Sequence, residues 1–338
     1  MKKVILLSLI MAVAFSSALF AGGRQQAGPE RHAFVFKNTG NPFGDRMMDG
    51  FRQSIEAQGY EAILMAPALP TAEAQIQIID QLIAQRVTSI TVAANDFDAL
   101  QPALIRARNQ GITVVSTDSA VNPASRITHV NQADTWMIGQ TLVEAVYDLT
   151  GGSGDFAILS ATSTASNQNA WIAVMQEVLQ QSRFQNLNLV SIVFGDDLPD
   201  RSTIEAQGLL TSFPNLRVIV APTTVGIAAA SRVVTDQGLI GQVIVTGLGL
   251  PSQMAAYIDN GAAPYMYLWN PIEMGYLAGY TAVALSRGNI TGNAGETFTA
   301  GRLGQFSVTQ APDGGTEILM GAPYRFDVTN INEWMDVF

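Results

Sequence analysis

Short apolar runs separated by helix-like segments recur along this chain, and this rhythm constrains its fold more than any other feature. Strand-like runs begin near positions 33, 61, 88, 112 and 127, and again near 155, 189, 217, 242 and 264. The segments 71–86, 134–149 and 272–285 place apolar residues every three or four positions, as in an amphipathic helix. Alternating strands and helices predict an α/β fold, with parallel sheets that are covered by helices on both faces.

The strand rhythm restarts after a turn-rich segment, TGGSG at 150–154. Ten strands are many for a single open sheet. We therefore expect two similar doubly wound parallel-sheet lobes, and the alternative is one large doubly wound domain.

Residues 1–21 have the pattern of a secretory signal peptide. Two lysines give a basic start, residues 4–20 are almost wholly apolar, and Ala21 ends a plausible cleavage site. An uncleaved membrane anchor is the alternative interpretation. The polar, glycine-rich segment 22–31 predicts a flexible leader, and no later stretch approaches the ~20 uninterrupted apolar residues of a membrane span.

Charge and cysteine content exclude several kinds of partner and anchor. The 338 residues carry 18 Lys and Arg against 28 Asp and Glu, a net charge of −10. This balance argues against a nucleic-acid partner, because such binding needs a basic face. The chain has no cysteine, so it can form no disulfide and offers no attachment point for a bacterial lipid anchor. A freely soluble exported protein suits a periplasm, so we expect a periplasmic protein of a bacterium with two membranes.

Polar residues follow the predicted strands, at the place where ligands bind in α/β folds. The five strand-end residues are Lys37 (AFVFK), Asp118 (ITVVSTD), Asn167 (through a polar loop after DFAILSA), Pro222 (RVIVAP) and Asn270 (PYMYLWN). The ligand crevice of an open α/β sheet lies at the carboxyl ends of its strands. None of the five is a strong nucleophile or metal ligand. The pattern therefore predicts a binding pocket with no catalytic residue and no metal.

Lys37 and Asp118 form the predicted polar centre of this pocket. A strand-end lysine can donate to a ligand oxygen, and a carboxylate accepts two hydroxyl protons at once, which suits neighbouring hydroxyls of a sugar. A solvated lysine, or a structural ion pair between the two residues, is the alternative.

Aromatic rings are the predicted stacking surfaces, because the axial C–H groups of a sugar pack on such rings. The candidates are Phe43, which closely follows Asn41, and the two tryptophans Trp171 and Trp269. An isolated aromatic side chain is more often part of a core, which is the alternative for each. Trp136 begins a helix and is assigned to packing.

Asn167, Gln168 and Asn169 form an uncommon run of three carboxamides. Each carries both a donor and an acceptor, which matches hydroxyl groups that must do both. Helix capping is the alternative, and it accounts for one of the three residues.

Motifs for a cofactor or for catalysis are weak. Gly247-Leu248-Gly249 follows a strand but lacks the third glycine of a dinucleotide fingerprint, so no cofactor is expected. His32 and His129, the two histidines of the chain, belong to no metal-spaced cluster and no nucleophile motif. We expect both to be structural and the protein not to be an enzyme.

Several motifs together resemble the ribose-type periplasmic sugar-binding proteins that feed ABC importers. FVFKNTGNPF looks like the first strand and ligand loop of that family, and STDSAV resembles the strand that delivers a ligand-binding aspartate. TASNQNAW (164–171), GLGLPSQM (247–254) and MYLWNPIEMGYLA (266–278) carry a narrower resemblance to the rhamnose-binding proteins and the related autoinducer-2 receptors. The resemblance covers essentially all of the chain after residue 21. It implies two lobes joined by three crossover strands, with the sugar held between them.

The narrower resemblance bears on the ligand. By position, the autoinducer-2 receptors would use Lys37, Asp118, Gln168 and Pro222 of this chain. They would carry an aspartate at the position of Asn167 and an alanine at that of Thr224. The rhamnose-binding relatives carry the NQNAW and LWNP runs, as this chain does. L-rhamnose or a similar 6-deoxy sugar is therefore the expected ligand, and autoinducer-2 is the alternative.

The resemblance also implies a division of the chain and of the site. We expect an N-terminal lobe of 32–131 plus 272–297 and a C-terminal lobe of 132–271 plus 298–338. The first lobe would present Lys37, Asn41, Phe43 and Asp118, and the second Asn167, Gln168, Pro222 and Trp269. Asn270 would lie at a crossover and sense closure. Trp171 and Thr224 are further candidates for contact with the ligand.

Closure around the sugar would create the shape that the membrane subunits of an ABC importer recognise. A chemoreceptor is a second candidate partner, and we expect a monomer. A sugar-sensing transcription regulator is disfavoured, since only 32 residues precede the first strand and most of them resemble a signal peptide.

Overall fold

The computed structural model describes residues 29–338, so the predicted signal peptide and most of the predicted leader lie outside the described residues. Residues 31–338 form one unit that contains two separate, mainly parallel sheets. The α/β fold with two lobes is confirmed, and the alternative of one large doubly wound domain is wrong.

The first sheet has seven strands in the order β13-β14-β5-β4-β3-β1-β2. Its N-terminal strands, all parallel, are β1 (Arg31–Val35), β2 (Glu61–Met65), β3 (Ser89–Val92), β4 (Thr113–Thr117) and β5 (Thr128–Asn131). Its helices are α2 (Pro42–Ala57), α3 (Ala72–Ala84), α4 (Gln101–Asn109) and α10 (Pro271–Ser286), with the short helix η1 (Pro123–Ser125) before β5. Strand residues alternate between two cores: Phe34 packs in the core that contains α2 and α10, whereas Val35 packs in the core that contains α3 and α4.

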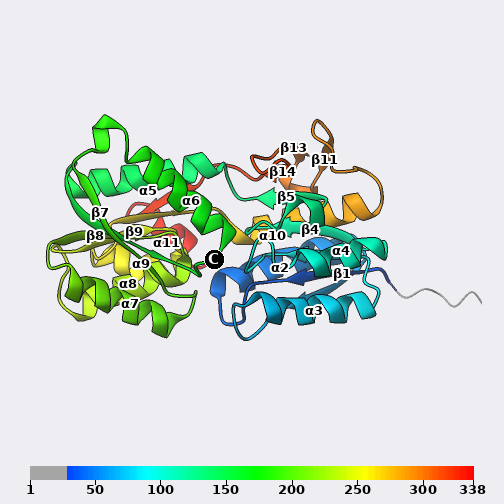
Figure 1. Ribbon diagram of the computed structural model, residues 1–338, viewed down its shortest axis with the longest axis horizontal. Coiled ribbons are helices and arrows are strands. Elements are labelled where there is room, and N and C mark those ends of the chain that lie inside the picture. Colours follow the sequence, from blue (N-terminus) through cyan, green and yellow to red (C-terminus); the bar gives the residue numbers. More distant parts are fainter. Residues whose placement is uncertain (1–28) are drawn as a thin grey trace, which may run out of the picture. The chain divides into compact units, whose positions relative to one another are not determined.

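The second sheet has four parallel strands in the order β7-β6-β8-β9. These strands are β6 (Gly154–Ser160), β7 (Leu187–Phe194), β8 (Leu216–Ala221) and β9 (Ile244–Gly247). The accompanying helices are α5 (Thr135–Thr150), α6 (Ser166–Val178), η2 (Ser182–Phe184), α7 (Pro199–Ser212), α8 (Thr224–Asp236) and α9 (Pro251–Asp259) (Figure 1). Phe156 to Leu159 are fully buried, as expected of a central parallel strand with helices on both faces.

The remaining strands lie in small sheets or at an edge. β10 (Tyr265–Leu268) pairs antiparallel with β15 (Tyr324–Asp327), and a single bridge, Leu248 to Tyr267, links β10 to the end of β9. β11 (Thr297–Thr299) and β12 (Gln305–Ser307) form a hairpin around η3 (Gly301–Leu303). All ten predicted strands are present, although the tenth joins an antiparallel pair instead of the second parallel sheet.

Helices α2 and α10 approach each other closely because glycines face the opposite backbone. A Cβ atom at Gly50 would lie 1.8 Å from the carbonyl oxygen of Ile272, and one at Gly275 would lie 1.8 Å from that of Met47. No side chain fits at either position without moving backbone. This contact fastens α10, a helix late in the sequence, to the first lobe.

The C-terminal segment divides between the two lobes, which corrects part of the predicted division. Residues 298–338 were expected in the C-terminal lobe, but β14 (Thr316–Leu319) pairs in parallel with β5, and β13 (Thr309–Gln310) extends the first sheet beside it. β15 pairs instead with β10, and the final helix α11 (Ile331–Trp334) packs on α9. In Figure 1 the orange strands β13 and β14 accordingly lie beside β5, and the red α11 lies near α9.

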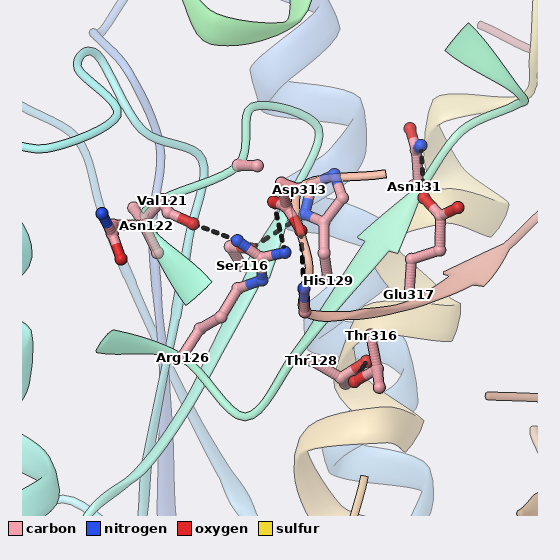
Figure 2. A network of polar contacts seen from close by, with 12 residues as sticks. Ser116, Val121, Asn122, Arg126, Thr128, His129, Asn131, Asp313, Thr316 and Glu317 are labelled. Atoms are coloured by element: carbon pink, nitrogen blue, oxygen red, sulfur yellow. Dashed lines mark hydrogen bonds and ion pairs between the residues drawn. The ribbon is translucent and has the colours of Figure 1, made fainter. Parts of the chain in front are cut away.

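A polar network explains why β14 docks on the first sheet (Figure 2). The buried guanidinium of Arg126 forms an ion pair with Asp313 at 2.7 Å and donates to the carbonyl oxygen of Val121. Asn131 donates to the carboxylate of Glu317 at 2.8 Å. The partners lie almost 190 residues apart in sequence, so no local pattern predicts their contact.

The chain crosses between the two lobes three times, after β5, after β10 and after β14. These crossings agree with the three crossovers that the family resemblance implies. Within residues 29–338 no helix is long and apolar enough to span a membrane.

The Arg126–Asp313 pair should contribute to stability, because removing Asp313 leaves a buried charge without its partner. We expect Asp313→Ala to lower the free energy of unfolding by about 2 kcal/mol, measured by urea denaturation. Asp80→Ala is the matched control, because it breaks the ion pair of Asp80 with Arg106, and both of these side chains are about half exposed. This substitution should lower the free energy of unfolding by less than about 0.5 kcal/mol. Equal effects of the two substitutions would contradict this assignment.

Candidate ligand-binding site

A cavity lies between the carboxyl ends of the two parallel sheets, and most of the predicted site residues line it. They are Lys37, Asn41, Phe43, Asp118, Gln168, Trp171, Pro222, Thr224 and Trp269. The lining also contains Phe36, Asp197, Thr223, Leu248 and Leu268, which the sequence did not single out. Asn167 and Asn270 do not line it. The contact of each residue with a ligand stays a prediction.

Lys37 and Asp118 meet in the lining of the cavity. Lys37 follows β1, Asp118 follows β4, and the Nζ atom of Lys37 lies 2.9 Å from Oδ2 of Asp118 with both side chains buried. Asp118 has φ of +59°, in the left-handed region, which aspartate adopts more readily than most residues. The ion pair that the sequence analysis gave as the alternative is therefore present, and both residues line the cavity.

Asp197 is a second buried carboxylate in the cavity and was missed at the sequence level. It follows β7 in a tight turn with φ of +52°, and its carboxylate accepts a hydrogen bond from Thr223 Oγ1. Burial raises its pKa, an effect that the positive charge of Lys37 partly opposes. The strand-end pattern that identified Asp118 also applies to Asp197, because Gly195-Asp196-Asp197 directly follows a strand-like run.

Gln168 offers an acceptor with no protein partner. Its side chain is 5 % exposed and lines the cavity, and its Oε1 atom has no hydrogen-bond donor in the described part of the chain. Asn169 points elsewhere and donates to the carbonyl oxygen of Ser163 at 2.9 Å. The residue before the helix, Ala165, provides no side-chain cap, so capping does not account for the carboxamide run.

The three predicted aromatic residues form a continuous cluster. Trp269 lies edge-on to Phe43 with ring centroids 6.2 Å apart, and to Trp171 at 5.9 Å. All three are buried and line the cavity. Among residues 29–338 the indole N–H of Trp269 finds no acceptor. Trp136, assigned to packing, is 40 % exposed and donates to Gln140 at 3.1 Å.

Asn41 and Asn270 act as helix caps. Asn41 Oδ1 accepts from the backbone N–H of Phe43 at 3.1 Å at the start of α2. Asn270 Oδ1 accepts from the N–H groups of Ile272 and Glu273 at 3.0 and 3.2 Å at the start of α10. Both side chains satisfy helix N-termini, and Asn41 also reaches the cavity.

The two histidines lie outside the cavity. His32 is paired with Ser89 and His129 with Ser116, each at 2.8 Å. Burial lowers the pKa of His32 to about 4 and that of His129 to about 3, helped by Arg287 and Arg126 respectively.

The cavity combines groups of three kinds. It has charged donors and acceptors, uncharged polar atoms that have no protein partner, and aromatic and aliphatic side chains in its walls. This combination suits a small molecule that carries several hydroxyl groups on an apolar ring. Across the described residues, no group of three or more histidine, aspartate or glutamate side chains could hold a metal ion.

Comparisons with known proteins give consistent matches. Residues 32–290 match the family model of the periplasmic binding protein domain. The D-ribose/D-allose-binding protein of Pseudomonas aeruginosa strain PAO1 is 26 % identical over 256 residues, which cover 72 % of this chain and 78 % of the relative.

Two solved structures are also similar. An ABC transporter solute-binding protein from Clostridium phytofermentas with bound L-rhamnose is 48 % identical, with a TM-score of 0.90, and the match covers 92 % of this chain and 99 % of that one. LsrB from Clostridium saccharobutylicum in complex with AI-2 is 20 % identical with a TM-score of 0.85, over 90 % of this chain and 99 % of that one. The second likeness shows a shared fold alone.

The buried carboxyl of Asp197 should make stability depend on pH. Because its pKa is raised in the folded state, the wild-type protein loses stability as pH rises through that pKa, whereas an asparagine has no proton to lose. We expect Asp197→Asn to raise the free energy of unfolding of the ligand-free protein by about 1 kcal/mol at pH 7.5, and the difference to vanish below about pH 4.

Urea denaturation at several pH values tests this expectation. Asp259→Asn, at an exposed position at the end of α9, is the control and should show no comparable trend. A destabilising effect of Asp197→Asn at pH 7.5 would mean that the carboxylate is held in its charged form.

Proposed function

This chain belongs to the periplasmic binding protein family, and we propose that it is the extracytoplasmic sugar-binding protein of an ABC importer. We further propose that its ligand is L-rhamnose or a closely related 6-deoxy sugar. The observation that carries the proposal is the buried cavity between the two lobes, where Gln168 and Trp269 direct unpaired polar groups among aromatic rings.

The unpaired atoms favour a ligand with hydroxyl groups. A buried polar atom without a hydrogen-bond partner costs roughly 1–3 kcal/mol. Oε1 of Gln168 can accept a hydroxyl proton, and the indole N–H of Trp269 can donate to a hydroxyl oxygen. A sugar satisfies both atoms, and its remaining hydroxyls suit Lys37, Asp118 and Asp197.

The apolar part of the wall favours a deoxy sugar. Phe36, Leu248 and Leu268 line the cavity and offer no side-chain donor or acceptor. A methyl group packs against such a surface, whereas a hydroxyl there would lose its hydrogen bonds to water. The 48 % identity to a solute-binding protein solved with L-rhamnose supports the same choice.

Function follows from closure of the two lobes on the sugar. Lys37 and Asp118 belong to the first lobe, and Gln168 and Trp269 to the second, so a ligand that contacts both sets stabilises the closed arrangement. The closed protein would then deliver the sugar to the membrane subunits of the importer. We propose that it is exported through a cleaved signal peptide and acts as a monomer, with a chemoreceptor as a second partner.

Autoinducer-2 is the alternative ligand. The four residues that its receptors would use, Lys37, Asp118, Gln168 and Pro222, all line the cavity. Asn167 and Thr224 depart from the pattern of those receptors and favour the deoxy sugar.

We expect the protein to bind L-rhamnose and to discriminate against L-mannose, which differs from it by one hydroxyl group at carbon 6. The dissociation constant for L-mannose should be at least about tenfold higher, because the additional hydroxyl would be buried against an apolar wall. Isothermal titration calorimetry with L-rhamnose, L-mannose, D-ribose and AI-2 measures this difference. Equal affinity for L-rhamnose and L-mannose would overturn the choice of a deoxy sugar, binding of AI-2 alone would establish the alternative, and no binding would overturn the sugar assignment.

Trp269→Phe should weaken sugar binding. The substitution keeps an aromatic ring but removes an N–H group that has no protein partner, together with part of a buried ring, so a hydrogen bond to the ligand and some packing are lost. We expect binding weaker by about 1 kcal/mol, roughly fivefold in the dissociation constant. Trp136→Phe is the control, since its indole lies outside this cavity, and it should not change affinity. Unchanged affinity in Trp269→Phe would show that this N–H does not contact the sugar.

A further inference from the structure

The first turn of α6 and the loop just before it reach across from the second lobe and form hydrogen bonds with loops of the first. Thr164 donates to the carbonyl oxygen of Asn95 at 2.7 Å, and Ser166 donates to that of Ala120 at 3.0 Å. Both acceptors lie in loops at the carboxyl ends of strands β3 and β4. These contacts join the lobes without any ligand group between them.

Asn167 makes the contact in this turn that reaches the candidate site. Its Oδ1 atom accepts from Ser119 Oγ at 2.7 Å and from the backbone N–H of Gln168 at 2.9 Å. Its Nδ2 atom donates to Oδ1 of Asp118 at 3.1 Å. The other carboxylate oxygen of Asp118 faces Lys37, so the carboxylate lies between a residue of its own lobe and a residue of the opposite lobe.

The Asp118–Asn167 pair also forms a partition between two cavities. Behind the ligand cavity lies a second cleft, whose lining includes Asn167 together with Asp118 and Trp171. Asp118 and Trp171 line both cavities, whereas Asn167 lines only the rear one. Asn167 thus supports Asp118 from the side that faces away from the ligand.

We propose that Asn167 is a positioning residue that locks the ligand-binding carboxylate of Asp118 in place when the two lobes close. The amide donates to the carboxylate from the opposite lobe, so this hydrogen bond forms only in the closed arrangement. It orients Asp118 for the ligand and couples that orientation to closure. The role of Asp118 as a ligand contact rests on the proposed function, whereas the bridge between the lobes does not.

The amide is suited to this role because it supplies a donor without a charge. An aspartate at position 167 could still accept from Ser119 and from the N–H of Gln168. Its carboxylate would face that of Asp118 at hydrogen-bond distance, where two like charges cannot both persist and one proton is shared between them. Protonation would replace the missing donor, so an aspartate should work at low pH and fail at neutral pH.

Other titratable groups face the Asp118–Asn167 pair, and their own titration has to be separated from that of the variant. Lys37 and Asp197 lie on the ligand side. On the rear side lie Arg126, His129, Asp134, Asp313 and Glu317, of which four appear in Figure 2. All of these groups are present in the wild-type protein, so the pH profile of each variant is compared with the wild-type profile.

The test is the affinity of Asn167→Asp for L-rhamnose between pH 5 and pH 8, measured by calorimetry. We expect a dissociation constant at least about tenfold above that of the wild type at pH 7.5, because a hydrogen bond to a charged group is replaced by repulsion. At pH 5 the dissociation constant of Asn167→Asp should lie within about threefold of the wild-type value. Asn167→Ala should also bind weakly, without recovery at low pH.

A matched control separates the bridge from a general effect of charge. Asn169→Asp adds the same charge to the same helix turn, but Asn169 bonds within its own lobe, so its profile should follow the wild type. Three results would overturn the proposal. Asn167→Asp could lose affinity equally at every pH, or it could keep the wild-type affinity at pH 7.5. The third is that Asn169→Asp shows the same dependence of affinity on pH as Asn167→Asp.

A ligand-free measurement keeps the proposal testable if the wild type binds none of the sugars. The chain has no cysteine, so spin labels at Gln77→Cys in α3 and Gln207→Cys in α7 report the distance between the lobes without background. Both positions are exposed. Adding Asn167→Asp should widen the distance distribution at pH 7.5 and restore it at pH 5. An unchanged distribution would overturn the bridge, whatever the ligand is.

Discussion

The contact on which the site depends is the buried pair of Lys37 and Asp118. Neither charge is stable in a buried position alone, and a buried pair repays its desolvation only when further hydrogen bonds complete its shell. In this protein Asn167 supplies one of these bonds from the opposite lobe. The electrostatics of the site and the positions of the two lobes are therefore parts of one arrangement, and the remaining donors and acceptors of the cavity are placed around it.

The parallel sheets explain why these groups converge. Each sheet directs the carboxyl ends of its strands toward the cavity, so residues that follow β1 and β4 meet those that follow β7 and β8. The helices hold the loops in place through local caps such as Asn41 and Asn270. Loops positioned in this way by buried strands can present polar groups precisely, since the strands themselves have little freedom to move.

Much of this arrangement could be predicted from strand ends alone. Lys37, Asp118 and Pro222 directly follow apolar runs, and a local pattern is sufficient to find them. Asp197 follows the same rule, but its strand is only partly buried, and its neighbours Gly195 and Asp196 have the composition of an ordinary surface turn. The role of Asn167 depends on how two lobes sit against each other, which no periodicity encodes. The docking of β14 could not be predicted for the same reason, because its partners are distant in sequence.

The position of β14 and α10 has a consequence for the order in which the chain can fold. The second sheet is built from one continuous stretch of sequence, from β6 to β9, whereas the first needs β1 to β5 together with a helix and a strand from the end of the chain. A chain made from its N-terminus can therefore complete its second parallel sheet before its first sheet. Contacts across such long separations are slow to form, so the first lobe exposes an open sheet edge along β5 until residue 319 has emerged.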